Sequence, residues 1–467
     1  RRVERRARPS RRCALSVERR VADRRVVAPL ELDRSASGGF FALIARIPLL
    51  RLRETFRRRR GPIAFLAVVG PGLIAGVAGN DAGGITTYAT LGSMTGLRFL
   101  WVLPFTALLL ALVQESVARL GVVSGQGLSD LIREHFGVRW TLFAMIVLLL
   151  ANLANTVANV AGAASALAIF GAPVALTAPI TAFVVWALVV YGSYKSVERI
   201  FLSLTAVFLA YIAAALLAKP NWAEVASSLT SPSLGGVSGA EMLLLVAVVG
   251  TTVTPYMQFY LQSAVAEKGI DVEELGAARA DAILGSVWTN FIAACVVIAT
   301  AVALGAIGKP LASAADAAVA LEPLAGSFAT ILFGAGLFGA SVLAMAIMPL
   351  TTAFAIAESF GLESGVNKRL GEAPAFYGIF TVILAIGAVV VMVPGLDPVG
   401  AIVSSQYLQG LFLPIILAFI VRLASSERLL GVHASPRWLR IAGWGAVALL
   451  AVLNVGVIVA NLVGLGG

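Results

Sequence analysis

PGLIAGVAGNDAGG, residues 71–84, lies inside an apolar run that extends from Pro62 to about Leu91. It places one carboxylate, Asp81, among glycines at membrane depth, where a charged side chain is costly. Gly and Pro weaken the helix that carries this stretch, and lipid cannot satisfy the backbone groups that a broken helix releases. Broken helices persist at that depth where they line a cavity inside the protein. The stretch therefore predicts a membrane protein with a polar site around Asp81.

A second interruption, VVGTTVTPYMQ at residues 248–258, lies five apolar segments further along the chain. Either interruption alone also fits a kink or a packing role, since Gly and Pro are common in transmembrane helices. Two broken helices in corresponding positions instead favour inverted repeats with a binding site between them. We therefore expect an all-α polytopic fold in which helices 1–5 and 6–10 form the repeats. Helices 1 and 6 are broken mid-membrane, and an eleventh helix is additional.

The composition excludes an ordinary soluble domain. Of the 467 residues, 59% are hydrophobic and 13% are charged, whereas soluble domains are about 25% charged. The mean hydropathy is +0.91. Residues 61–467 are therefore expected to form a transmembrane transporter domain of about eleven helices. The expected spans are 63–93, 99–121, 140–168, 173–191, 200–217, 241–264, 280–305, 326–357, 375–394, 398–421 and 439–463.

Positive charge is concentrated at one end of the chain. Residues 1–60 hold 19 Arg and 6 acidic residues, a balance of +13, whereas the remaining residues hold 16 basic and 19 acidic residues, a balance of −3. We expect residues 1–60 to form an Arg-rich, disordered cytosolic tail that touches anionic lipid. Little else in the sequence favours a nucleic-acid partner, so the lipid bilayer is the expected partner of this tail.

Charges in the connecting loops predict the orientation of the chain. Basic residues are more frequent in alternate loops, and the richer side is cytoplasmic by the positive-inside rule. This predicts a multi-pass plasma-membrane protein with a cytoplasmic N-terminus and an external C-terminus. The predicted cytoplasmic loops carry Arg133, Arg139, Lys195, Arg199, Lys268, Arg279, Lys368, Arg369, Arg422, Arg428, Arg437 and Arg440. The predicted external loops carry Arg98, Lys219 and Lys309.

Asp81 is the one carboxylate placed near the centre of a predicted span. A carboxylate, the free carbonyls of an unwound helix and nearby hydroxyls together make a cation site of hard oxygen ligands. Alternatively, Asp81 caps the second half-helix, and it could serve in both ways. An intramembrane aspartyl protease needs two carboxylates in one site, and the sequence places no second acid there. We therefore expect neither an enzyme nor a bound cofactor.

Four motifs resemble the metal-ion transporters of the Nramp family: GPGLIAGVAGNDAGG (70–84), QESVARLGVVSGQGLSDL (114–131), GTTVTPYMQFYLQS (250–263) and SSQYLQGLFLP (404–414). The similarity covers about residues 60–465. It implies a LeuT-type inverted-repeat fold, with a metal ion held between the unwound middles of helices 1 and 6. The metal-site candidates that the resemblance carries over are Asp81, Gly84, Ala78, Thr251, Thr254 and Gln406, with Asn80 and Tyr256 nearby.

Helices 1 and 6 depart from the family pattern. Members that carry manganese or iron have Asp-Pro-Gly-Asn where this chain has Asp-Ala-Gly-Gly, at 81–84. They have Ala-Thr-Val-Met-Pro-His where it has Thr-Thr-Val-Thr-Pro-Tyr, at 251–256. Losing the thioether lowers the preference for softer transition metals, and losing the Asn predicts a wider cavity. Mg2+ retains several waters and needs one or two carboxylates. The pattern resembles the prokaryotic Nramp-related magnesium transporters, so we expect partly hydrated Mg2+ to be transported, with Mn2+ as a second candidate.

Helix 3 departs from the family as well. Proton-coupled members carry two acids in Thr-Asp-Leu-Ala-Glu-Val-Ile-Gly, and the matching positions here are Thr156 and Asn159. Neither side chain titrates, and the family histidine after the helix 6 proline is Tyr256, so the carriers of a proton route are lost. We expect uncoupled uptake by alternating access around Asp81. Inward movement of a dication gains about 4.6 kcal/mol per 100 mV of membrane potential, which is sufficient to drive it.

Several alternatives remain open from the sequence. The runner-up function is a proton-coupled Mn2+ or Fe2+ importer. A sodium-coupled organic solute permease of the same fold and a sensor or structural protein are further alternatives. Gln406 fits either a metal ligand or an interhelical hydrogen bond. Glu115 and Arg119, near the end of the second span, fit an interfacial ion pair better than a transport role. The sequence sets no oligomeric state, and a monomer fits it.

Overall fold

The computed structural model describes residues 72, 75–76, 79–191, 208–233, 235–304, 311, 314–318, 326, 329–364 and 370–462. Within these residues, all regular elements are helices. The first are α6 (Ala82–Thr95), α7 (Val102–Ser124), α8 (Leu128–Phe136), α9 (Val138–Ala168), α10 (Val174–Tyr191), α12 (Phe208–Leu217) and α13 (Trp222–Thr230). They are followed by α14 (Gly239–Thr252), α15 (Pro255–Glu267), η2 (Val272–Glu274), α16 (Leu275–Ala303), α17 (Ala314–Ala318), α19 (Ala329–Phe360), α20 (Pro374–Val391), α21 (Pro398–Ala424), α22 (Glu427–Leu430), η6 (Gly431–His433) and α23 (Arg437–Leu462).

Nine helical segments of the described chain are long and apolar enough to cross a membrane. They are Val102–Ser124, Val138–Ala168, Val174–Tyr191, Gly239–Glu267, Val272–Ala303, Phe333–Phe360, Pro374–Val391, Pro398–Ala424 and Arg437–Val459. The first and fifth predicted spans are described in part, as α6 and α12. The Arg-rich residues 1–60 lie outside the described residues, so the expected division of the chain near residue 60 stays a prediction.

The first predicted span is broken, as the sequence indicates. Its described residues before position 77 are helical, a turn covers residues 79–81, and α6 then starts at Ala82. The first half-helix is tied to α16, because the N–H of Gly72 donates to Asp281 Oδ2 at 2.7 Å. The backbone groups released by the turn therefore lie inside protein and not against lipid.

The sixth predicted span is broken in the same way. α14 ends at Thr252 and α15 starts at Pro255, with residues 253–254 outside both helices. A proline can begin a helix but cannot continue one, since it lacks a backbone N–H. The Thr252 hydroxyl shares a hydrogen bond of 2.8 Å with the Tyr88 hydroxyl of α6. This bond joins the half-helix before the second break to the half-helix after the first.

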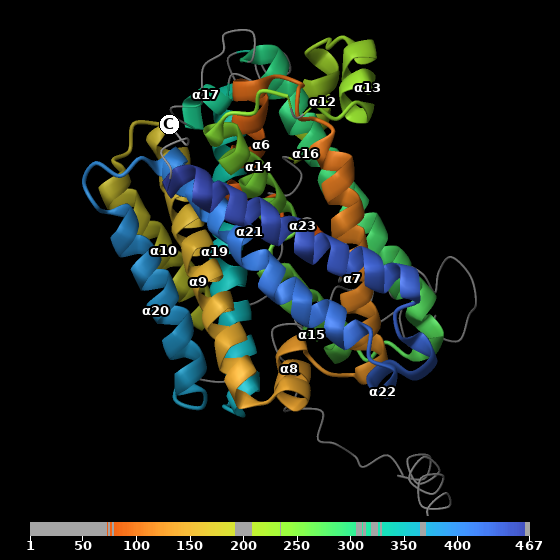
Figure 1. Cartoon of the computed structure of the whole chain (residues 1–467). Coiled ribbons are helices and arrows are strands. Elements are labelled where there is room, and N and C mark those ends of the chain that lie inside the picture. The colour runs from red at the N-terminus through yellow and green to blue at the C-terminus, as the bar shows by residue number, and fades with distance from the viewer. Residues whose placement is uncertain are drawn as a thin grey trace, which may run out of the picture. The chain divides into compact units, whose positions relative to one another are not determined.

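Helices of the first repeat pack against their counterparts in the second. α7 packs against α16, α9 against α19, and α10 against α20. α9, α10, α19 and α20 form one group of helices, and α7 and α16 lie away from that group (Figure 1). α21 contacts α9 of the first group and also α14, the first half of the second broken helix. α23 packs on α21. This pairing is what inverted repeats of five helices produce.

The short helices lie at two opposite ends of the long ones. α8 and α22 lie at one end, and α13 and α17 lie at the other (Figure 1). α8 and α22 belong to loops that the charge pattern places on the cytoplasmic side, whereas α13 and α17 belong to loops placed outside. The alternation of the loops is therefore consistent with the predicted topology, and which end faces the cytoplasm stays a prediction.

α14 and α21 cross at two glycines. A Cβ on Gly250 would lie 2.2 Å from the carbonyl oxygen of Gln406 and 2.3 Å from the nitrogen of Gly410. A Cβ on Gly410 would lie 2.5 Å from the carbonyl oxygen of Val246. Small residues permit this close approach of helix backbones in membranes. The crossing brings the part of α21 that carries Gln406 against α14 just before its break.

Gly250→Ala is expected to lower the free energy of unfolding by about 1–3 kcal/mol, because the added methyl group forces α14 away from α21. Thermal unfolding of the purified protein in detergent measures the change. Gly378→Ala in α20 is the matched control, since a Cβ there meets no atom within 4 Å. Equal stability of the two variants would contradict the close crossing.

Candidate metal site

Asp81 is the N-cap residue of α6, and its carboxylate is buried with 5% of the residue exposed. Oδ1 accepts a hydrogen bond from the backbone N–H of Gly84 at 2.8 Å, and Oδ2 accepts one from Asn159 Nδ2 at 3.0 Å. Capping satisfies a free N–H at the helix start, and the positive end of the helix favours an anion there. The capping alternative is confirmed. A carboxylate has about four acceptor sites, so capping does not exclude a ligand role.

Asn159 of α9 holds the carboxylate of Asp81 and the start of α6 together. Its Oδ1 accepts a hydrogen bond from the backbone N–H of Ala82 at 3.3 Å. Its Nδ2, which carries two hydrogens, donates to Asp81 and to the carbonyl oxygen of Asn155 at 2.8 Å, and the Met348 sulfur lies 3.6 Å from it. The sequence identifies this residue as a position that has lost a proton carrier. The structure adds that it directly contacts the central carboxylate.

Thr156, the other position without its proton carrier, lies elsewhere. Its hydroxyl donates to the carbonyl oxygen of Asn152, one turn earlier in α9, at 2.7 Å. Its methyl group faces α20, where a Cβ on Gly387 would lie 3.1 Å from it. Of the two helix 3 positions, the structure therefore brings Asn159 to Asp81 and directs Thr156 toward a neighbouring helix.

Gln406 of α21 reaches the first break from the opposite side. Its Nε2 donates to Asn155 Oδ1 at 2.8 Å, so the expected interhelical hydrogen bond is confirmed. A Cβ on Gly83 would lie 2.1 Å from this Nε2 and 3.1 Å from Asp81 Oδ1, so only glycine leaves room for the amide beside the carboxylate. Gln406 Oε1 has no hydrogen-bond partner within the part of the chain that the structure describes. Its role as a metal ligand stays a prediction.

The two breaks meet at Gly84. A Cβ on Gly84 would lie 2.5 Å from the carbonyl oxygen of Gly79 and 3.5 Å from Thr251 Oγ1 of α14. This contact concerns a single Cβ position, so the expectation of a wider cavity stays a prediction. The Gly79 carbonyl, freed by the turn before α6, occupies the space that an Asn side chain would need.

The remaining predicted residues lie around the same breaks. Thr254 is the N-cap residue of α15, and its side chain makes no capping hydrogen bond. Tyr256 follows it at the start of α15, and Asn80 lies in the turn before α6; both are buried. Ala78 lies outside the described residues. Of the predicted residues whose exposure the structure gives, Asp81 is the most exposed, at 5%, so the site is closed to solvent.

Several buried oxygens of this region have no hydrogen-bond partner among the described residues. They are Thr251 Oγ1, Thr254 Oγ1, Gln258 Oε1 and Gln406 Oε1. Buried polar atoms in native proteins are nearly always paired, so an unpaired group points to a ligand or water. Together with Asp81 they offer one carboxylate and neutral oxygens, the donors that a hard cation prefers. Within the described ranges, no three His, Cys, Asp or Glu side chains gather into a metal-binding group.

Three residues of this region were not predicted from the sequence as site residues. Asn155 precedes Asn159 by four residues, so the two amides lie on one face of an apolar helix, and that spacing was a usable signal. Gln258 likewise follows Thr254 by four residues in α15, and its Nε2 donates to the Thr254 carbonyl at 3.4 Å. Met348 lies within an apolar stretch of α19 and carries no signal of its own.

Two broken helices, counterpart packing of two repeats and a buried oxygen-rich site between them define a secondary transporter. The fold is that of solved LeuT-type transporters. Mhp1, a nucleobase-cation-symport-1 family transporter, superposes with a TM-score of 0.55 at 15% identity, over 85% of this chain and 91% of that one. The manganese transporter of Eremococcus coleocola superposes with a TM-score of 0.69 at 24% identity, over 84% and 85%. The latter was solved in complex with an aromatic bis-isothiourea substituted compound.

The sequence match identifies the family. Residues 72–460 match the family Nramp, described as natural resistance-associated macrophage protein-like. The chain belongs to this family, and it is a multi-pass membrane transporter and not an enzyme. Proteins called divalent metal cation transporter MntH are similar to it. That of Klebsiella pneumoniae is 26% identical over 85% of this chain and 95% of its own length, and that of Caldanaerobacter subterraneus is 26% identical over 84% and 92%.

Asn159→Ala is expected to weaken binding of a divalent ion about 10–100-fold, because Asp81 loses the donor that orients Oδ2. Titration calorimetry of the purified protein measures the affinity. Thr156→Ala is the matched control, since it removes a polar group three residues away that does not contact Asp81. If both variants bind as the wild type does, Asn159 has no part in orienting the carboxylate.

Proposed function

We propose that this divalent metal transporter takes up partly hydrated Mg2+ by uncoupled alternating access around Asp81. The observation that carries the proposal is the pairing of one buried carboxylate with neutral oxygens that lack partners. The proposed site comprises Asp81, the backbone at Gly84 and Ala78, the hydroxyls of Thr251 and Thr254, and the Gln406 amide. The proposed setting is the plasma membrane, with the N-terminus in the cytoplasm and the C-terminus outside.

The donor set supports a hard ion. Mg2+ dehydrates reluctantly and is usually held by one or two carboxylates with waters retained, whereas thioether sulfur favours softer metals. Position 254, which carries a sulfur ligand in the manganese and iron carriers of the family, is a threonine here. The Met348 sulfur lies near the site, and the Asn159 Nδ2 that bonds to Asp81 lies 3.6 Å from it. Neither Met348 nor Met257, whose sulfur lies near Gly79, occupies the position of the family's sulfur ligand.

The surroundings of Asp81 support uncoupled transport. The two groups that hold its oxygens in place are the backbone amide of Gly84 and the carboxamide of Asn159, and neither can relay a proton. His135 lies in α8 and His433 in η6, outside the breaks at residues 79–81 and 253–254. Because the cargo carries two charges, an inside-negative potential can drive its entry without a coupled ion.

Alternating access follows from the closed site. Since the central residues are buried, an ion enters and leaves only when half-helices move. A movement of α6 relative to α9 would displace Asp81, because its Oδ1 caps α6 and its Oδ2 accepts a hydrogen bond from Asn159 of α9. A dication placed between the breaks neutralises the carboxylate and supplies the unpaired oxygens with a partner. Binding would therefore favour the closed arrangement from either side.

A proton-coupled Mn2+ or Fe2+ importer is the alternative, and the names of similar proteins favour it. The Eremococcus coleocola protein is a manganese transporter, and the curated relatives are divalent metal cation transporters. At 23–26% identity, replacements inside the site can change the ion without changing the fold. The two functions differ in ion selectivity and in proton flux, so one measurement separates them.

Ion entry into proteoliposomes tests the proposed function. With Mg2+ and Mn2+ dyes in parallel and a pH dye inside, we expect Mg2+ entry that is driven by an inside-negative potential and causes no acidification. Mg2+ entry should move no protons, since the groups that bond to the Asp81 carboxylate are amides that cannot relay a proton. Mn2+ entry with acidification and without Mg2+ entry would establish the alternative.

Asp81→Asn separates the two roles of Asp81. An Asn oxygen still caps α6, but its Nδ2 faces the Asn159 Nδ2 donor, so the variant should fold with a modest loss of stability. Metal flux should fall more than about tenfold because the charge is gone. Asp81→Ala should lose the flux and also about 0.5–2 kcal/mol of stability, since the cap is lost. Flux and thermal unfolding of the same preparations measure both effects. Normal flux in the Asn variant would refute the site.

Thr254→Met tests the basis of ion selectivity. Added sulfur should raise Mn2+ entry relative to Mg2+ severalfold, since a thioether is a softer ligand. Thr254→Val is the matched control, because it removes the hydroxyl without adding sulfur. Selectivity that is the same in both variants would show that the thioether does not decide the preference. Gly84→Asn is a poorer test, because its Cβ must displace the Gly79 carbonyl.

A further inference from the structure

A small open crevice, with a cavity volume of about 30 Å3, lies between α7, α21 and α23. Most of its lining is apolar and comes from all three helices. Its polar lining residues are Ser116, Ser425, Ser435 and Arg440. Ser425 follows the end of α21 and Arg440 lies in the first turn of α23, so the polar part is at the ends of the spans. The crevice is therefore amphipathic along the membrane normal.

The crevice faces the surroundings of the domain and not its interior. Only 17% of the α23 span is buried within the described structure, and the neighbouring Trp438 is 63% exposed at the start of that helix. Trp is typical of the membrane–water interface. The apolar walls of the crevice therefore lie at the depth of acyl chains, and its polar end lies at the depth of lipid headgroups.

The segment around the polar end carries an excess of positive charge. Residues 422–440 contain four Arg and one acidic residue, Glu427. Of these arginines, Arg440 lines the crevice, whereas Arg437, one turn earlier in the same helix, does not. Basic pockets between transmembrane helices at the membrane surface are suited to anionic headgroups.

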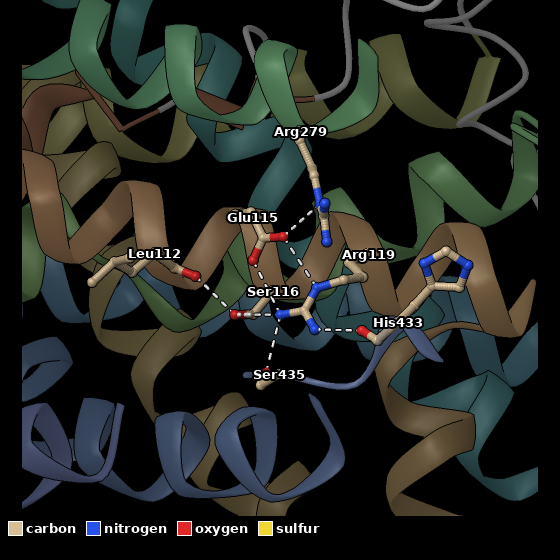
Figure 2. Close-up of polar contacts among 7 residues, drawn as sticks. All are labelled: Leu112, Glu115, Ser116, Arg119, Arg279, His433 and Ser435. Atoms are coloured by element: carbon tan, nitrogen blue, oxygen red, sulfur yellow. Dashed lines mark hydrogen bonds and ion pairs between the residues drawn. The ribbon is translucent and has the colours of Figure 1, made fainter. Parts of the chain in front are cut away.

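A buried arginine network fixes the polar end of the crevice (Figure 2). Arg119, 1% exposed, donates to both carboxylate oxygens of Glu115 at 3.1 Å, to the His433 carbonyl at 2.7 Å and to Ser435 Oγ at 3.0 Å. Arg279 also pairs with Glu115, at 2.7 Å, so two arginines share one carboxylate. The predicted Glu115–Arg119 ion pair is confirmed. Ser435 is held in place because its Oγ accepts a hydrogen bond from Arg119. Its hydroxyl proton is therefore able to donate to another group.

We propose that this crevice binds one anionic phospholipid. An acyl chain lies against the apolar walls of α7, α21 and α23, and the phosphate accepts hydrogen bonds from Arg440 and the Ser435 hydroxyl. The single negative charge of the phosphate complements the excess positive charge of residues 422–440 and of the Arg119 network. The site is distinct from the broken helices, and the proposal does not depend on which ion is transported.

Native mass spectrometry of the purified protein with equal amounts of phosphatidylglycerol and phosphatidylcholine tests the proposal. Phosphatidylglycerol should bind in preference to phosphatidylcholine. Arg440→Gln should weaken phosphatidylglycerol binding about fivefold, the effect of about one headgroup contact. Its matched control, Arg437→Gln, removes the same charge outside the crevice and should change binding less than twofold. Neither arginine is part of the proposed metal site, so metal binding should be unchanged in both variants.

A second pair of variants tests the apolar part of the crevice. Ala446→Phe places a ring among the lining residues and should reduce binding of both lipids, whereas Ala448→Phe, on the exposed side of α23, should not. Thermal unfolding checks that each variant is folded. Equal binding of the two lipids by the wild type, equal losses in Arg440→Gln and Arg437→Gln, or full binding by folded Ala446→Phe would each overturn the proposal.

Discussion

The desolvated carboxylate of Asp81 is the constraint on which the rest of the structure depends. Removing such an ion from water costs several kcal/mol unless donors inside the protein replace the lost hydrogen bonds. The Gly84 N–H and the Asn159 amide replace two of them. One donor exists because the helix begins at that point, and the other because α9 packs beside the break. The break in the first span and the position of α9 thus together supply the donors that stabilise the buried carboxylate.

The polar network extends outward from this pair in a definite order. Asn159 is linked to Asn155 on the same helix face, and Asn155 accepts from Gln406 of α21. α21 reaches this position because Gly250 and Gly410 let its backbone approach α14. Glycines that look like helix weaknesses in the sequence are therefore what brings three helices to one carboxylate. The unpaired oxygens that remain are those that a cargo ion can use.

Much of the architecture could be predicted from the sequence, because broken apolar segments leave a strong local signal. Both interruptions were located to within a few residues, and Asp81 was identified by its cost at membrane depth. What could not be predicted is which polar side chain meets which. Asn159 was recognised through the loss of an acid, yet its bond to Asp81 depends on the rotation of α9. The position of the Gly79 carbonyl beside Gly84 could not be predicted either, since it is a property of the folded turn.

The breaks also divide the two broken helices into halves that lie at different depths in the membrane. α6 is joined to α14 by the Tyr88–Thr252 bond, whereas the first half-helix is held by Asp281 of α16. Each half of a broken helix therefore has its own attachment, and no continuous helix transmits a tilt from one half to the other. In the transport cycle proposed above, the two ends of the path would therefore open as separate hinged gates, with Asp81 between them. A change in bilayer thickness, or a mutation on one side of the membrane, would then alter the opening of one gate while the other gate keeps its geometry.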